Sequence, residues 1–565
     1  MFDYLSEYKK WQNSNLVPEE MKQEISNLDE EEKKSRFYTL LNFGTAGLRG
    51  ILGAGLNRMN IFTVRHATQA VSSLILEEGQ AACLRGVVVA CDSRIMSTEF
   101  SREVCKVFAA NGIKSYLFDE LRPTAELSYA VRKLNCIAGV NITASHNPKE
   151  YNGYKLYWQD GAQITPEQAK AVFSRMKETD VFDDVKIIND DELSKYITTL
   201  TKDFDEKYLS EILKQSINPD VIKKQSDIKI VYTPIHGSGY RLVPEILSMA
   251  GFKNICLVKE QMQPDGNFPT VKSPNPENKE SFNLAMELAG KECCDLIIGT
   301  DPDTDRIGVV APDENCNYSV LTGNQTGAIL LEYIISAKRA KGTLPDNACA
   351  IKTVVTSELG TSICNKNNIK MMNVLTGFKF IGEKMEEFDK NKDYTFIFGY
   401  EESYGCLAGT HARDKDAVVA ALLICEAAAY YKEQGMTLLD ALYSIYAKYG
   451  FYSEKVINIE ITGAYASEKM AELMRNLRSN PILKVGNACV SEVIDYEKGI
   501  DDLPKSNMLY YKLDDGSNFV IRPSGTEPKV KIYVMTLADN CADSKEKAET
   551  YANEIEEIFN VKNKV

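Results

Sequence analysis

The alternation of short apolar runs with helical patterns constrains this fold more than any other feature of the sequence. Residues 85–91 enclose a run of valines typical of a buried strand, and residues 114–118 predict a second strand. Between them, the apolar spacing over 98–111 predicts a helix that ends before Gly112. A strand, a helix and a strand at this spacing form a βαβ unit, which favours a parallel or mixed sheet.

The same alternation recurs in two later segments. Strands are predicted at 228–232 and 295–299, and again at 348–353 and 394–398. The last segment differs, because it combines strand-like pieces with helical stretches, at 455–461, 519–522, 530–536, 466–478 and 544–559. We therefore expect three α/β domains and a smaller α+β C-terminal domain, with boundaries at 1–205, 206–322, 323–450 and 451–565.

Composition argues against several classes of protein. With 44% hydrophobic and 26% charged residues, the chain has the composition of a soluble globular protein. Its net charge of −14 argues against nucleic acid or an anionic membrane as the main partner. We see no secretory signal at the start, and the longest apolar run, 417–425, is too short to span a bilayer. The fourteen cysteines form no CxxC pair, which favours reduced thiols in the cytoplasm.

One loop carries a candidate nucleophile. An apolar run at 137–142 predicts a buried strand, and residues 143–155 after it are rich in Asn, Pro and Gly, as loops are. Ser145 stands beside His146, and Lys155 follows ten positions later, so a hydroxyl, an imidazole and an amine share one strand-end loop. From these residues alone, an ordinary polar turn is an equally good interpretation.

A second loop is suited to a metal ion. Asp301, Asp303 and Asp305 alternate between two apolar strands. Three close carboxylates repel one another unless a cation lies among them. Oxygen ligands without Cys or His select a hard ion, and the lack of EF-hand spacing favours Mg²⁺ over Ca²⁺. The alternative interpretation is a solvated acidic turn.

Two other loops could bind an anion. Arg49 lies in a glycine-rich stretch at 43–50, and at 522–529 Ser, Gly and Thr stand between Arg522 and Lys529. Free backbone amides, hydroxyls and guanidinium groups are suited to phosphate. A plain glycine turn is the alternative in each case.

A sugar-binding loop is predicted after the strand at 394–398. Glu401 and Ser403 there are good acceptors for sugar hydroxyls, although acidic residues at that place also suit a helix N-terminus. A basic segment, 411–416, follows and contains Lys415.

Four of these loops together resemble a known family. They are Thr-Ala-Ser-His-Asn-Pro at 143–148, Asp-Pro-Asp-Thr-Asp-Arg at 301–306, Gly-Tyr-Glu-Glu-Ser-Tyr-Gly at 399–405 and Arg-Pro-Ser-Gly-Thr-Glu-Pro at 522–528. In this order they resemble the phosphohexomutases of the phosphoglucomutase/phosphomannomutase superfamily. The resemblance covers most of the chain and implies four domains around a central cleft.

The resemblance implies roles for the matching positions. Ser145 is expected to carry a transferable phosphoryl group and to hold Mg²⁺ together with Asp301, Asp303 and Asp305. The expected acid–base and charge-stabilising groups are Arg49, His146, Lys155, Arg306 and Lys415. Contacts to the phosphosugar are expected from Glu401, Ser403, Thr376, Gly377, Arg522, Ser524, Gly525 and Thr526.

The implied reaction interconverts α-D-glucose 1-phosphate and glucose 6-phosphate through glucose 1,6-bisphosphate, which also primes the enzyme. A cytoplasmic monomer or dimer is expected. Tyr404 and Gly405 after the Glu-Glu-Ser sequence resemble the glucose form of the loop, whereas Tyr400 and Pro302 also resemble a branch that includes phosphopentomutases and sugar-bisphosphate synthases. A phosphopentomutase, a phosphomannomutase and a non-catalytic sugar-phosphate sensor are therefore the alternatives.

Overall fold

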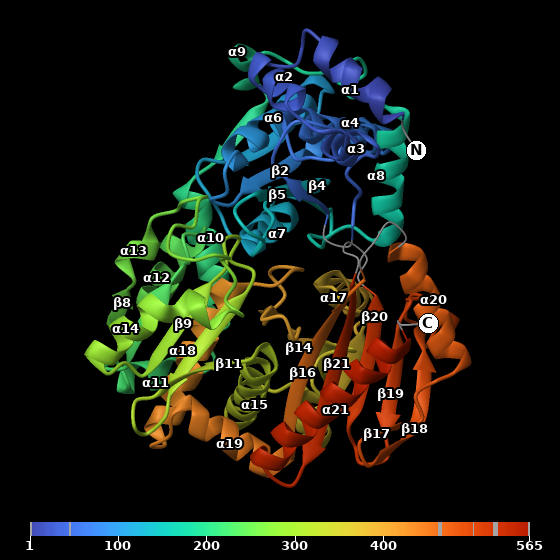
Figure 1. The fold of residues 1–565 in the computed structure, drawn as a ribbon. Helices are drawn as coiled ribbons and strands as arrows, with labels where there is room; N and C mark the ends of the chain where they lie inside the picture. The colour runs from blue at the N-terminus through green and yellow to red at the C-terminus, as the bar shows by residue number, and fades with distance from the viewer. Residues whose placement is uncertain (1–2, 45–46, 462–465, 501, 524–528, 563–565) are drawn as a thin grey trace. The chain divides into compact units, whose positions relative to one another are not determined.

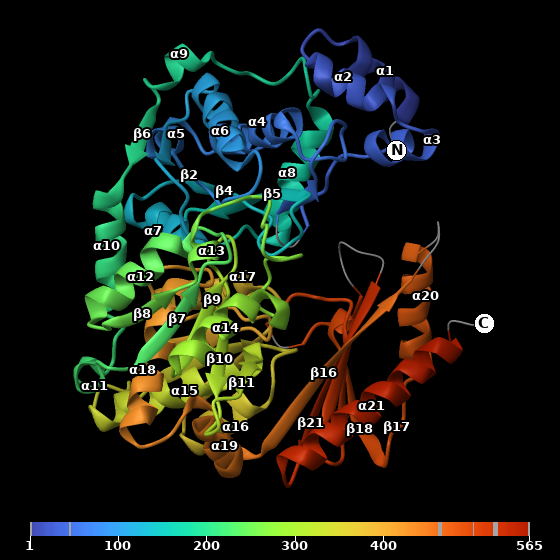
Figure 2. The ribbon, with the colours of Figure 1, turned by 60° about the vertical axis from the view of Figure 1, so that its left-hand side comes forward.

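The computed structural model describes residues 3–44, 47–461, 466–500, 502–523 and 529–562. These residues form two compact units. Unit 1 comprises Met1–Gly323, Ile381–Lys392 and Ser403–Thr437, and unit 2 comprises Asn324–Phe380, Asp393–Glu402 and Leu438–Val565. Figures 1 and 2 show the elements of each unit.

The first sheet of unit 1 is mixed, with strand order β1-β5-β4-β2-β3-β6. Its strands are β1 (Leu48–Ile51), β5 (Tyr151–Trp158), β4 (Ala138–Ile142), β2 (Val87–Cys91), β3 (Ser115–Phe118) and β6 (Ile197–Leu200). The predicted parallel pairing is confirmed for β2 with β3 and β4, whereas β5 runs antiparallel to β4. Strands β2 and β4 are buried along their whole length, which explains the apolar run of β2 and the largely apolar run of β4, where Asn141 is the polar exception.

Helices of the N-terminal segment precede and accompany this sheet. They are α1 (Tyr4–Asn13), α2 (Glu19–Ser26), α3 (Glu30–Phe37), α4 (Ile61–Glu77), α5 (Gln80–Arg85), α6 (Ser97–Ala110), α7 (Thr124–Lys133), α8 (Pro166–Glu178) and α9 (Asp190–Leu193). Trp11 of α1 is fully buried against Phe37, Phe62 and Phe182, which joins the first helices to the core of this sheet.

The second sheet of unit 1 has the order β11-β10-β9-β7-β8. Its strands are β11 (Tyr318–Leu321), β10 (Ile307–Pro312), β9 (Leu296–Thr300), β7 (Lys229–Thr233) and β8 (Asn254–Leu257). The accompanying helices are α10 (Lys202–Leu213), α11 (Pro219–Lys224), α12 (Gly239–Ala250), α13 (Lys259–Met262), η1 (Lys279–Phe282), α14 (Asn283–Glu292) and α18 (Ala417–Glu433). Strands β9 and β10 are antiparallel neighbours, so residues 301–306 form the short connection between two buried strands.

Unit 2 contains a parallel sheet and an antiparallel sheet. In the first, β12 (Ala348–Thr353) pairs in parallel with β13 (Lys370–Val374) and β14 (Thr395–Tyr400). The second has the order β16-β21-β20-β19-β18-β17: β16 (Phe451–Glu460), β21 (Lys529–Ala538), β20 (Asn518–Pro523), β19 (Leu509–Leu513), β18 (Ala488–Asp495) and β17 (Lys484–Val485). The remaining elements of unit 2 are α15 (Gly323–Ala340), α16 (Leu359–Lys366), α19 (Leu438–Tyr449), α20 (Ala466–Ser479), η2 (Tyr496–Lys498) and α21 (Cys541–Lys562). Strand β15 (Cys406–Leu407) and most of helix α17 (Phe378–Asn391) belong to unit 1.

The predicted fold class is confirmed, with three α/β segments followed by a C-terminal sheet with two helices. Strand β14 is longer than predicted and continues through Gly399 and Tyr400, which pair with Ile351 and Lys352 of β12. The loop predicted at 143–155 is wrong beyond residue 150, because β5 begins at Tyr151 and pairs with β4 and β1, so Lys155 lies on a strand. The four domain boundaries stay predictions, and residue 205 lies inside helix α10. All fourteen cysteines are free, and no helix of the described residues is long and apolar enough to cross a bilayer.

Candidate active site

The loop after β4 presents Ser145 in a strained and buried position. Its φ is +53°, in the left-handed region that serine rarely adopts, and its side chain is almost inaccessible. The Ser145 N–H donates to Thr143 Oγ1 (2.8 Å), and the Thr143 hydroxyl in turn donates to Asp92 Oδ2 (2.6 Å). This chain of hydrogen bonds fixes the backbone from which the Ser145 hydroxyl projects.

Arg94 holds the same loop through its backbone carbonyl groups. Its guanidinium donates to the carbonyl oxygens of Ser145 (2.5 Å), Pro148 (2.9 Å) and Tyr151 (2.9 Å), and also to that of Asn147. The Arg94 side chain is fully buried and forms an ion pair with Asp92 (3.3 Å). A planar fork of five donors suits this task, because several carbonyls can be held at once.

The Ser145 hydroxyl faces the three aspartates. Ser145 Oγ donates to Asp301 Oδ2 (2.8 Å) and lies 3.2 Å from His146 Nδ1. One carboxylate oxygen from each of Asp301, Asp303 and Asp305 can be chosen so that all three lie within 4.8 Å of one another. The structure therefore joins the loop after β4 with the loop between β9 and β10, as the sequence interpretation requires.

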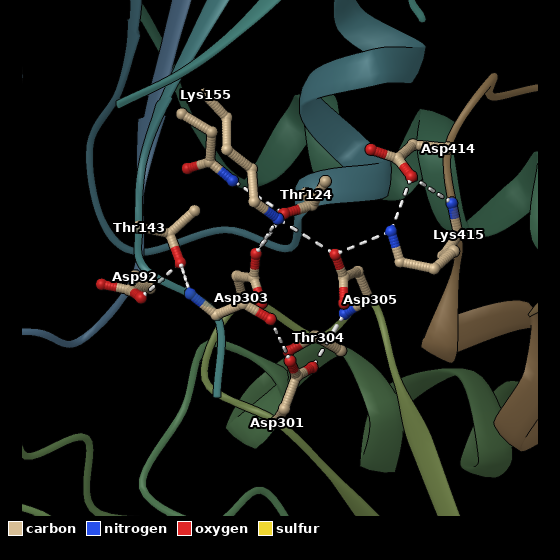
Figure 3. Close-up of polar contacts among 12 residues, drawn as sticks. Asp92, Thr124, Thr143, Lys155, Asp301, Asp303, Thr304, Asp305, Asp414 and Lys415 are labelled. Carbon is tan, nitrogen blue, oxygen red and sulfur yellow. Dashed lines mark hydrogen bonds and ion pairs between the residues drawn. The ribbon is translucent and has the colours of Figure 1, made fainter. Parts of the chain in front are cut away.

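Each aspartate uses one oxygen to anchor itself (Figure 3). Asp301 Oδ1 accepts from the backbone N–H groups of Asp305 (3.1 Å) and Arg306 (3.0 Å). Asp303 Oδ2 and Asp305 Oδ2 both accept from Lys155 Nζ, at 2.6 and 3.0 Å. The other oxygens of Asp303 and Asp305 are buried and have no hydrogen-bond partner among the described residues.

This donor set fits a divalent cation. The three carboxylates are buried and preorganised, and two of their oxygens lack the partner that a buried acceptor normally requires. Together with the Ser145 oxygen, they offer a set of oxygens alone, which Mg²⁺ and Ca²⁺ prefer over softer metals. The predicted acidic loop is therefore a candidate metal site and not a solvated turn.

Two lysines balance part of the negative charge. Lys155 is buried between Asp303 and Asp305, and Lys415 Nζ lies 3.2 Å from Asp305 Oδ2 and 2.9 Å from Asp414 Oδ1 (Figure 3). Burial alone would raise the pKa of Asp305, but Lys155 and Lys415 lower it below its ordinary value. The same carboxylates raise the pKa of Lys155 in spite of its burial, so this amine stays charged.

Asp414 holds Lys415 in place. Its Oδ2 accepts from the Tyr157 hydroxyl (2.7 Å) and from Gln163 Nε2 (2.8 Å), and its Oδ1 accepts from the Lys415 N–H (2.8 Å). Gly405 permits this arrangement, because a Cβ there would lie 2.0 Å from the Lys415 Cδ atom. Asp414 therefore acts on the candidate site through Lys415.

The remaining predicted basic groups of unit 1 lie close by. Burial, together with Arg306 and Arg49, lowers the pKa of His146 well below its ordinary value. Arg49 Nη1 donates to Asn147 Oδ1 (3.0 Å), and Arg306 Nη1 donates to Glu277 Oε1 (2.8 Å). The structure thus places Arg49, His146, Lys155, Arg306 and Lys415 around one cluster.

The predicted sugar and phosphate residues are found mostly in unit 2. Glu401 Oε1 accepts from the Gly377 N–H (3.0 Å), and Thr376 Oγ1 is buried without a partner among the described residues. Arg522 lies at the end of β20. Ser403 belongs to unit 1. Ser524, Gly525 and Thr526 lie outside the described residues.

Several residues that support the candidate site could not be recognised from any motif in the sequence. They are Asp92, Arg94, Thr124, Asn141 and Asp414, and their partners are mostly far away along the chain. Asp92 and Arg94 do follow directly after strand β2, at the same sheet edge as the loop after β4. That position is the one available hint, since parallel strands bring their carboxyl ends together.

Comparison with known proteins decides the family. The descriptions "Phosphoglucomutase/phosphomannomutase, alpha/beta/alpha domain" I, II and III match residues 40–182, 206–314 and 322–449. A phosphoglucomutase of Staphylococcus aureus (strain bovine RF122 / ET3-1) is 37% identical over 527 residues, covering 91% of this chain and 93% of the relative. The chain belongs to the phosphoglucomutase/phosphomannomutase family. The predicted superfamily is confirmed, and the protein is an enzyme of the phosphohexomutase type that acts on small phosphosugars.

Solved structures agree with this fold. Paramecium pp63/parafusin, a phosphoglucomutase in an open form, has a TM-score of 0.70 at 18% identity and covers 92% of this chain and 94% of its own. N-acetylphosphoglucosamine mutase of Aspergillus fumigatus, in complex with GlcNAc-6P and magnesium, has a TM-score of 0.51 at 15% identity. The match covers 92% of this chain and 96% of that chain. At these identities the likeness concerns the fold.

Proposed function

We propose that this enzyme interconverts α-D-glucose 1-phosphate and glucose 6-phosphate through a phosphoserine at Ser145 and a glucose 1,6-bisphosphate intermediate. The observation that carries this proposal is the meeting of Ser145 Oγ with Asp301 Oδ2, at 2.8 Å, inside a buried cluster of three carboxylates and two lysines. The name phosphoglucomutase of the Staphylococcus aureus relative supports the choice of glucose.

The reaction requires two phosphoryl transfers. In the first, the bond between Ser145 Oγ and phosphorus breaks, a bond from phosphorus to the free sugar hydroxyl forms, and that hydroxyl gives up its proton. Ser145 Oγ takes up a proton when its bond to phosphorus breaks. In the second transfer, Ser145 Oγ gives up its proton and attacks the other phosphate of the bisphosphate, the bond from that phosphorus to the sugar oxygen breaks, and the sugar oxygen takes up a proton, which restores the phosphoserine. Lys155, Lys415, Arg49 and Arg306 are charged groups that can stabilise the charge that develops on the transferred group.

Asp301, Asp303, Asp305 and the Ser145 oxygen are the proposed ligands of Mg²⁺. When bound, the ion would offset the negative charge of the phosphoserine and polarise its oxygens. The unpartnered oxygens of Asp303 and Asp305 support this assignment, as does the magnesium bound to the Aspergillus fumigatus relative. Glucose 1,6-bisphosphate is the proposed priming molecule.

The proposed sugar and phosphate contacts come from the remaining loops. Glu401, Ser403, Thr376 and Gly377 would contact the sugar, and the buried Thr376 hydroxyl supports a polar partner there. Arg522 with Ser524, Gly525 and Thr526 would hold the phosphate that is not transferred. We also propose a cytoplasmic enzyme, with a monomer or dimer as the predicted assembly.

Tyr400, which the sequence interpretation also relates to a phosphopentomutase branch, packs inside unit 2. It is buried and stacks on Phe398, and Gly327 and Gly360 leave the space that its ring and hydroxyl fill. This packing supports a structural role for Tyr400 in unit 2.

Substrate choice is tested by comparing kcat/KM for the 1-phosphates of glucose, mannose and ribose. We expect glucose 1-phosphate to be preferred at least tenfold, equivalent to about 1.4 kcal/mol of transition-state discrimination. A tenfold preference for ribose or mannose 1-phosphate would move the assignment to a phosphopentomutase or a phosphomannomutase. No turnover of any of them, with binding retained, would favour the sugar-phosphate sensor.

A further inference from the structure

Side chains from the segment of the first sheet hydrogen-bond to Asp303, although Asp303 belongs to the loop between strands β9 and β10 of the second sheet. Its Oδ2 accepts from Lys155 Nζ on β5 (2.6 Å) and from Thr124 Oγ1 at the start of α7 (3.0 Å) (Figure 3). The two backbones also meet, because the Thr124 N–H donates to the Asp303 carbonyl oxygen at 2.9 Å. Thr124 and Asp303 are both fully buried.

Asn141 also contacts the Thr124 hydroxyl. Its Nδ2 lies 2.8 Å from Thr124 Oγ1. An ionised carboxylate accepts hydrogen bonds only, so the single proton of the Thr124 hydroxyl must go to Asp303. The hydroxyl oxygen is then left to accept from Asn141. Asn141 and Lys155 stand opposite each other in the pairing of β4 with β5, so their side chains lie on one face of the sheet, where Lys155 contacts Asp303 and Asn141 contacts Thr124.

In this arrangement one carboxylate oxygen of Asp303 accepts hydrogen bonds, and the other is left available for a cation. Lys155 and Thr124 occupy Oδ2, and Oδ1 is the buried oxygen without a partner among the described residues. A carboxylate that could rotate freely would not present the same oxygen to a cation. Groups that hydrogen-bond to metal ligands commonly set metal affinity in this way.

We infer that Thr124, supported by Asn141, is a positioning residue for the metal ligand Asp303, so that the cation site is built by the first and second sheet segments together. The inference rests on the metal site of the proposed function. Thr124 makes no contact with the cation itself. Its hydroxyl selects the oxygen that Asp303 offers, and its backbone N–H holds the peptide of the loop.

The test measures Mg²⁺ affinity directly, by titration calorimetry on the full-length protein with Ser145 in one phosphorylation state, checked by intact mass. Thr124→Val removes the hydroxyl but keeps the shape and the backbone N–H. We expect it to raise the Kd for Mg²⁺ 10- to 100-fold. Thr124→Ser, which retains a hydroxyl, is expected to stay within about threefold of wild type. Should Thr124→Val fail to fold, Thr124→Ala provides a second variant without the hydroxyl and is expected to show the same loss.

Thr68→Val is the matched control. Thr68 is also fully buried. Its hydroxyl donates to the Val64 carbonyl oxygen (2.8 Å) within α4 and makes no hydrogen bond to the aspartates. We expect this variant to lose stability without losing Mg²⁺ affinity. Wild-type affinity in Thr124→Val would overturn the inference while leaving the metal site in place. Absence of Mg²⁺ binding in the wild-type protein would overturn the proposed metal site and the inference with it.

Discussion

At the scale of single residues, Ser145 is held in a conformation that it would not adopt alone. A φ of +53° is unfavourable for a residue with a side chain, so the surrounding contacts must impose it. Arg94 binds the Ser145 carbonyl oxygen, and Thr143 binds its N–H. The Ser145 hydroxyl, the proposed phosphoryl carrier, is therefore directed at Asp301 in the absence of substrate, and such preorganisation would favour phosphoryl transfer.

Replacing Ser145 by alanine should remove mutase activity almost completely and leave the fold intact. The change deletes the proposed phosphoryl carrier, whereas one loop hydroxyl contributes little to stability. Activity is measured with glucose 1-phosphate, and the fold is followed by thermal unfolding against wild type. Retention of substantial activity would rule out Ser145 as the carrier.

Asp303→Asn should lower both Mg²⁺ affinity and kcat, the latter by about a hundredfold. The amide keeps the shape of the side chain but loses the charge that Lys155 and the cation share. Chelation of the wild-type enzyme should abolish turnover, and added Mg²⁺ should restore it. Undiminished turnover after chelation would show that the aspartates serve another purpose.

At the scale of elements, the strands and their polar loops could be predicted because their signals are local. The runs before Thr143 and before Asp301 are apolar, and the loops are rich in Gly, Asn, Pro and Asp. Arg94 could not be assigned in this way, because the nearest of its four carbonyl partners is 51 residues away. Thr124 lies 179 residues from Asp303. Such contacts depend on how the sheets pack, which no local pattern contains.

The contact between α7 and α10 contains a buried carboxyl pair. Burial and the neighbouring Asp205 raise the pKa of Glu126 well above its ordinary value of 4.5, although Arg122 and Arg241 oppose this. Arg122 Nε binds Asp205 Oδ1 at 2.7 Å and lies 3.8 Å from Glu126. Glu126 is therefore protonated in the folded protein at pH values where it ionises in the unfolded chain.

Glu126→Gln should stabilise the protein increasingly as the pH rises. Because the pKa of Glu126 is higher in the folded protein than in the unfolded chain, its contribution to the free energy of unfolding falls as the pH rises from the unfolded pKa, 4.5, towards the folded pKa. Glutamine does not titrate, so the variant is spared this loss. The measurement is Tm of both proteins across this range, with Glu120→Gln, at the exposed end of the same interface, as the control. A difference in Tm that did not depend on pH would contradict the account of Glu126.

At the scale of the whole molecule, the residues that the sequence motifs predicted are divided between the two units. Unit 1 holds Ser145, the aspartates and the lysines, and unit 2 holds Glu401 and Arg522. The sequence alone identified each of these residues through its motif. It did not show that the third sheet and the C-terminal sheet form one compact unit, because their contacts, such as Tyr452 with Ser362 (2.8 Å), are long-range.

Arg522→Ala should raise KM strongly and lower kcat less than Ser145→Ala does, since the proposed role of Arg522 is to bind phosphate without forming a bond to the reacting atoms. Steady-state kinetics with glucose 1-phosphate measures both constants. Arg478→Ala is the control, because Arg478 belongs to the same C-terminal segment and pairs instead with Asp495 (3.2 Å). An unchanged KM in Arg522→Ala would show that this loop does not bind the substrate.

The most direct test of the phosphoserine route is intact-mass analysis of the protein after incubation with glucose 1,6-bisphosphate and Mg²⁺. The account predicts the gain of one phosphoryl group in the wild-type protein and its location on Ser145 by peptide mapping. It also predicts that Ser145 again carries phosphate after turnover of glucose 1-phosphate, because each cycle restores the phosphoserine. Ser145→Ala should gain none. Turnover of glucose 1-phosphate by a protein that never carries phosphate on Ser145 would contradict the account.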